Sequence, residues 1–115
     1  MDKKTKEIVE ILKGPMETLK KINEQNLVDV KDQIDDIISM EFKDENIIEH
    51  TFDRLLDLAH WYGIDIKDIY YKFLDYYKKT NKEASDDYKE FYLEILMEMD
   101  EPLDENDKQF YLKRK

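Results

Sequence analysis

The chain has 115 residues, 29 of them acidic and 19 basic, and a formal net charge of −10 at pH 7. That length accommodates one domain, and the lack of cysteine excludes disulfides, thiol catalysis and cysteine-ligated zinc. No apolar run approaches the about 18 residues of a membrane span, and an acidic chain is poorly suited to nucleic acid or anionic lipid, so we expect a cytoplasmic protein with a basic protein partner and no cofactor.

Apolar residues recur at helical spacing along almost the whole chain, and no strand alternation is evident. The first predicted helix covers residues 3–13 and is interrupted by Gly14 and Pro15, because proline lacks an N–H and suits the first position of a new helix. A second helical segment covers residues 15–25. The sequence leaves open whether these two segments form one kinked helix or two.

Asn26 is expected to cap a further helix over residues 27–41. Three more helices are predicted after it, each following a side chain that can accept hydrogen bonds from the first turn: Asp44, Asp65 and Ser85. The first covers residues 45–62 and ends at Gly63, the second fades near Asn81, and the third covers residues 86–100 and stops before Pro102.

A short last turn is predicted over residues 104–112, and residues 110–115 are expected to form a frayed basic tail. Short connections join all of these segments, which favours antiparallel neighbours. The sequence therefore predicts a single all-α domain over residues 1–115, a compact bundle of five or six mostly antiparallel helices.

One stripe of the predicted helix over residues 45–62 carries three carboxylates and an imidazole: Glu49, Asp53, Asp57 and His60. Hard divalent cations prefer carboxylate oxygens, so this stripe is a candidate metal site. The alternative is a solvated acidic flank that pairs with Arg54 and nearby lysines. His60 borders the apolar face and is expected to be half-buried, whereas His50 is expected at the surface.

The end of that predicted helix resembles the segment after the second metal-binding motif of all-α nucleotide pyrophosphatases of the MazG and dimeric dUTPase type. The residues that carry the resemblance are Leu58-Ala59-His60-Trp61-Tyr62-Gly63-Ile64-Asp65, with Ile69 and Tyr70. That family holds magnesium with an E-x-x-E helix and an E-x-x-D helix. Here the first motif would need paired glutamates in residues 29–41, where Asp32, Asp35 and Asp36 stand. Asn46 and His50 stand where the second motif has its acids.

A second acidic stripe lies on the predicted helix over residues 86–100 and consists of Asp87, Glu90, Glu94 and Glu98. Like charges at i, i+4 destabilise a helix, so either basic groups elsewhere in the fold offset them or the stripe faces a basic partner. Trp61 and Tyr71 lie off the main apolar faces of their helices and are the aromatic anchors expected for such an interface. The alternative is that both helices are central and both rings belong to the core.

These features favour stoichiometric protein binding over catalysis. We expect an inhibitor or immunity-type protein that neutralises a basic partner such as a nuclease toxin, or a phage inhibitor that mimics DNA. Lysine far outnumbers arginine, which is typical of A/T-rich codons and indicates a low-GC bacterium or its phage. The alternatives are a divergent metal-dependent nucleotide pyrophosphohydrolase and a homodimeric structural subunit built on four apolar residues: Leu58, Trp61, Leu93 and Met97.

Overall fold

The computed structural model describes the backbone of residues 3–115 and the side chains of residues 16–115. Over those residues the chain is all-helical, which confirms the predicted fold class. The elements are α1 (Lys3–Ser39), α2 (Glu45–Tyr62), the 3₁₀ turn η1 (Gly63–Ile66), α3 (Lys67–Lys78), α4 (Lys82–Glu98) and α5 (Glu105–Arg114). None of the described helices combines the length and the apolar character that crossing a membrane requires.

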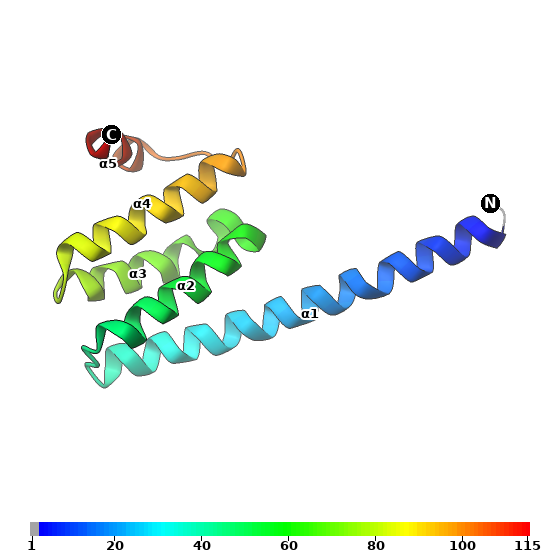
Figure 1. Ribbon diagram of the computed structural model, residues 1–115, viewed down its shortest axis with the longest axis horizontal. Coiled ribbons are helices and arrows are strands. Elements are labelled where there is room, and N and C mark those ends of the chain that lie inside the picture. Colours follow the sequence, from blue (N-terminus) through cyan, green and yellow to red (C-terminus); the bar gives the residue numbers. More distant parts are fainter. Residues whose placement is uncertain (1–2) are drawn as a thin grey trace.

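The helices form a bundle from which one end of α1 projects (Figure 1). α2 runs back along α1, α3 and α4 pack on each other and on the first pair, and α5 lies over α4. α1 is much longer than α2, so its N-terminal half leaves the bundle alone and the molecule measures 60 × 34 × 19 Å. We call residues 3–22 of α1 the arm and residues 23–115 the body.

α1 runs as one helix through Gly14-Pro15, which settles the alternative that the sequence left open there, and through Asn26, where the predicted helix start is wrong. Proline in a helix removes one N–H, but its fixed φ is compatible with helical backbone, so the helix continues through Pro15. Asn26 is not a cap, because it lies inside α1, where the Gln25 side-chain amide donates to the Asp29 carboxylate at 2.9 Å. Side chains at i and i+4 are neighbours on a continuous helix, so this bond agrees with an unbroken α1.

Both predicted ends of α2 are confirmed. The Asp44 carboxylate accepts hydrogen bonds from the backbone N–H groups of Asn46, at 2.9 Å, and Ile47, at 3.3 Å. At the other end the Gly63 N–H donates to the Ala59 carbonyl, and Gly63 takes a φ of +57°. That left-handed φ suits glycine, and it turns the chain out of α2 into η1.

The predicted caps of the next two helices are wrong. Asp65 lies inside η1, and α3 begins at Lys67 without a side-chain cap. α4 begins before Ser85, because Asn81 accepts the Ala84 N–H at 3.0 Å and is the actual cap. Ser85 is buried, and its hydroxyl donates to the Leu74 carbonyl at 2.9 Å. Its side chain therefore ties α4 to α3 and is unavailable for capping.

Aromatic rings from three helices fill the centre of the body. Phe52 of α2 lies against Phe73 of α3 and Tyr88 of α4, with ring centroids 4.5 and 4.6 Å apart. Tyr70 and Tyr92 stack at 4.3 Å. Buried phenols need hydrogen-bond partners, and Tyr70 donates to the Tyr88 carbonyl at 2.6 Å. The core therefore joins α2, α3 and α4 through ring contacts, and the Tyr70 hydroxyl bonds to the backbone of α4 within it.

Candidate functional site

The acidic stripe of α4 is engaged by the chain's own C-terminus. The Arg114 guanidinium pairs with the Asp87 carboxylate and reaches Glu90 at 3.3 Å, and the Lys115 ammonium lies 3.4 Å from Glu94. Residues 110–115 were predicted to be frayed, but α5 is helical to Arg114 and holds these cations against α4. Three of the four predicted partner-binding carboxylates thus have intramolecular partners, which offsets the repulsion within the stripe.

A buried ionic cluster docks the start of α5 on α3 and α4. Asp107 is buried, and its carboxylate lies 2.9 Å from the Lys67 ammonium and 3.5 Å from the Lys89 ammonium. Asp107 is not among the candidate site residues that the sequence predicts. Tyr71 belongs to the same cluster, with both ammonium groups near its ring at 5.1 and 5.3 Å. Burial, together with the Asp107 carboxylate, raises the pKa of Tyr71. This ring holds α5 in place and is not an exposed anchor.

The two remaining predicted contact residues are exposed. Trp61, in the last turn of α2, keeps 41% of its surface in solvent. Glu98, the last residue of α4, is exposed and lines a hollow with Glu94, Met97 and Tyr111. Of the four apolar residues predicted for self-association, Leu58 and Leu93 are buried in the core, whereas Trp61 and Met97 are exposed.

The acidic stripe of α2 does not converge on a metal-sized site. Glu49 is drawn inward, since it accepts hydrogen bonds from the Tyr77 hydroxyl at 2.8 Å and the Tyr88 hydroxyl at 3.4 Å. Asp53, Asp57 and His60 are exposed, so the expected half-buried histidine is wrong. Within the part of the chain whose side chains are described, no three histidine, aspartate or glutamate side chains are grouped as metal ligands.

The cluster of aspartates on α1 likewise stays apart from that stripe. Asp35 pairs with Lys72 of α3 at 3.2 Å, while Asp32 and Asp36 are exposed. Asn46 and His50, at the positions of the second metal-binding motif, line a hollow with Gln33 and Ile47. Among the described side chains, the aspartates of α1 therefore do not join the acidic stripe of α2 in one group of ligands.

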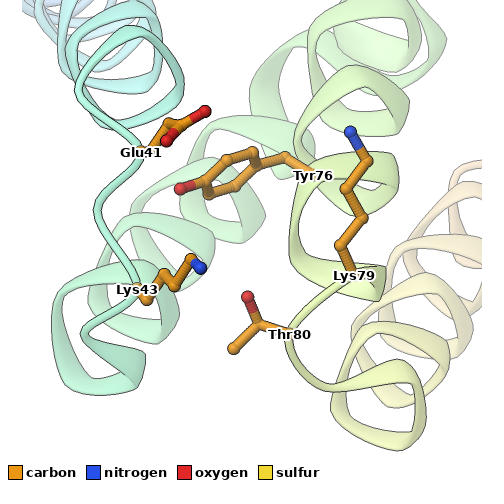
Figure 2. A pocket seen from close by; sticks show the side chains of 5 residues that line it. All are labelled: Glu41, Lys43, Tyr76, Lys79 and Thr80. Atoms are coloured by element: carbon orange, nitrogen blue, oxygen red, sulfur yellow. The ribbon is translucent and has the colours of Figure 1, made fainter.

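A hollow of about 320 Å³ lies at the end of the bundle opposite the arm. Figure 2 shows the Tyr76 ring reaching across it from α3 toward the connection between α1 and α2, where its hydroxyl donates to the Phe42 carbonyl. The remaining side chains around it are all exposed: Glu41, Lys43, Lys79 and Thr80. It holds no buried polar group that would select a ligand, so we assign no function to it.

The arm carries apolar side chains that no part of the body covers. Met16 and Leu19 are 66% and 46% exposed, and Ile22 is exposed as well. Eighteen residues make five whole turns of an α-helix at 3.6 residues per turn, so Met16 shares a face with Ile34 and Leu19 with Ile37. Ile34 and Ile37 are buried in the body. We call Met16, Leu19 and Ile22 the arm stripe, which continues the core-facing side of α1 beyond the core.

The sequence placed the arm stripe on one helix face but did not show that the face is uncovered. Two features of the sequence could have indicated this exposure. One is the eighteen-residue spacing from Met16 to Ile34 and from Leu19 to Ile37, and the other is the shorter apolar pattern of the helix over residues 45–62. A helix of that length cannot cover both halves of α1.

Comparison with protein-family models, with curated proteins and with solved structures finds no match to this chain. The assignment of function therefore depends on the surfaces of the molecule: the arm stripe, the acidic body and the ionic contacts that close the C-terminus.

Proposed function

We propose that the protein is a non-catalytic protein-binding module whose two binding features are the arm and the acidic body. The observation that carries the proposal is the arm stripe, since its members are exposed on the same face that buries Ile34 and Ile37 farther along α1. Contiguous exposed apolar residues on a helix are typical of surfaces that another polypeptide covers.

The charge of the body supports a basic partner. Residues 23–115 contain 25 acidic and 13 basic residues, a net charge of −12. A body with this charge attracts basic proteins over a distance and accelerates their association. Within this class we propose a stoichiometric inhibitor or immunity-type role, in which the module neutralises a basic protein such as a nuclease toxin.

The acidic stripe of α4, which we call the α4 stripe (Asp87, Glu90, Glu94 and Glu98), is already partly occupied, and this limits how a basic partner can bind there. Arg114 and Lys115 already pair with Asp87, Glu90 and Glu94, so the partner's cations displace these two residues or bind beside them at Glu98. Intramolecular ion pairs at the surface are weak, so displacement costs little. The C-terminus then acts as a weak internal competitor that a basic partner can displace.

The test is affinity capture from cell lysate at low and at high salt with three baits: the wild-type protein, Leu19→Glu and Val28→Glu. Val28 is a matched control, because it is 52% exposed. It lies nine residues from Leu19, which is about two and a half helical turns, and is therefore on the opposite side of α1. We expect the wild type and Val28→Glu to retain a basic protein stoichiometrically at low salt and to release it at high salt, and Leu19→Glu to lose it. Equal retention by all three baits would remove the arm from the proposal, and empty baits at both salt concentrations would contradict it entirely.

A further inference from the structure

We propose that a second copy of this chain covers the arm stripe, so that two arms pack antiparallel and form a symmetric dimer. This inference deepens the proposed function and rests on it for the premise that the arm is a binding surface. It is carried by the length of the arm, by its position relative to α2, and by the opposite charges of arm and body.

The position of α2 shows where a second helix fits. α2 runs antiparallel to α1 and ends at Tyr62. Beyond that point the same face of α1 continues as the arm stripe, and no other helix of the described chain lies beside it (Figure 1). An antiparallel arm from a second copy occupies the line that α2 would follow if it were longer.

The lengths match. The arm has 20 residues, about 30 Å of helix, and α2 has 18, about 27 Å. Arm-on-arm packing therefore repeats an interface of the length that α1 and α2 already form within one chain. In the sequence, apolar residues at Ile8 and Leu12 precede Met16 at helical spacing, so both halves of the arm carry the pattern. A two-fold axis requires such a self-complementary surface, because each half of one arm meets the other half of its partner.

Charge selects the antiparallel arrangement. Residues 1–22 contain six basic and four acidic residues, while the body has a net charge of −12. Antiparallel arms place the two acidic bodies at opposite ends of the dimer, whereas parallel arms would bring them side by side. The lysine-rich start of each arm then reaches the other copy's junction of arm and body, where Glu24 and Asp57 lie. The arm of a second copy therefore has both features required of a partner: apolar side chains for the arm stripe and basic side chains for the acidic body.

Sedimentation of the full chain at several concentrations measures the association. We expect the wild type to approach twice the 14.1 kDa of one chain. Leu19→Glu places a carboxylate in the apolar contact of both copies and should raise the dissociation constant more than about tenfold, because each carboxylate loses water without gaining a partner. Its circular dichroism should stay helical, since Leu19 makes no core contact, and Val28→Glu should remain dimeric. A monomeric wild type, or equal association of both variants, would overturn the inference.

Cysteine cross-linking tests the orientation, and the chain has no native cysteine to interfere. In antiparallel arms only positions near the two-fold axis meet their own copy, and the middle of the arm lies between residues 12 and 13. We expect Leu12→Cys to form an intermolecular disulfide rapidly and Leu19→Cys to form it slowly. Rapid disulfide formation at both positions would indicate parallel arms, and formation at neither would show that the arms do not pair. Both results contradict the inference.

The two proposals fail in different ways. A monomeric wild type that still loses its captured protein on Leu19→Glu leaves the arm as a site for another protein and removes only the dimer. A dimer that dissociates on Leu19→Glu while capture persists confirms the arm contact and assigns the basic partner to the acidic body alone.

Discussion

Leu19 and Ile37 lie on the same face of α1, five turns apart, yet Leu19 is 46% exposed and Ile37 is 3% exposed. The difference arises because α2 covers only the C-terminal half of α1. A continuous helix therefore presents one apolar face to two environments: the core of the body, and the solvent or a binding partner.

Alanine substitutions at these two positions should separate the environments. Ile37→Ala is expected to lower the free energy of unfolding by about 2–5 kcal/mol, because it leaves a cavity in the core. Leu19→Ala should change it by less than about 0.5 kcal/mol when the chain is monomeric, as at other exposed positions. Urea unfolding at submicromolar concentration measures both values. Similar losses for the two variants would show that the body covers the arm.

Removal of Arg114 and Lys115 should strengthen the binding of basic ligands. These residues pair with Asp87, Glu90 and Glu94, so their deletion exposes the α4 stripe to solvent cations. We expect a decalysine peptide to bind the truncated chain severalfold more tightly than the wild type at low salt, and the gain to vanish at high salt.

The matched control for this truncation is Lys113→Ala, since Lys113 is exposed in the last turn of α5 and has no ion pair with the α4 stripe. It removes one positive charge without freeing the stripe. Equal gains from the control and the truncation would assign the effect to net charge alone.

Asp107→Asn should destabilise the docking of α5. The substitution keeps the shape of the side chain but leaves the ammonium groups of Lys67 and Lys89 without their shared carboxylate. The expected loss is about 2–3 kcal/mol, below that of a wholly buried pair because both lysines retain contact with water. Urea unfolding measures the loss. Glu105→Gln, on the exposed side of the same turn, should have little effect, and a comparable loss there would point to α5 helicity in general.

The stability of the fold should fall at alkaline pH. Burial, followed by the Asp53 and Glu49 carboxylates, raises the pKa of Tyr88 to about 12 from the ordinary value of 10.0. A raised folded-state pKa means that the unfolded chain ionises first, so stability is intact below pH 10 and is lost as the pH rises toward 12. Burial raises the pKa of Tyr70 and Tyr77 as well, which adds to the same trend.

Denaturant midpoints between pH 9 and pH 12, together with tyrosinate absorbance, follow this transition. Tyr88→Phe should flatten the decline, because phenylalanine keeps the ring against Phe52 but has no proton to lose. A midpoint that does not change with pH over this window would show that the buried phenols ionise as readily in the fold as in the unfolded chain.

Much of the secondary structure could be predicted because it depends on local interactions. The apolar spacing identified every helical region, and Asp44 and Gly63 determined the ends of α2 through hydrogen bonds within a few residues. Local rules failed where a longer-range contact competes with them. Ser85 bonds to Leu74 of α3 instead of capping α4.

The amino-acid sequence alone determined that this protein is all-helical, acidic and free of cysteine chemistry, because composition and apolar spacing are properties of the chain itself. Only the tertiary structure decided which apolar and charged faces are satisfied internally. It placed Tyr71 and Asp107 inside, paired the α4 stripe with Arg114 and Lys115, and left the arm stripe uncovered. The physical reason is that exposure depends on which helices lie beside a face, and that arrangement is set by packing between segments distant in the sequence.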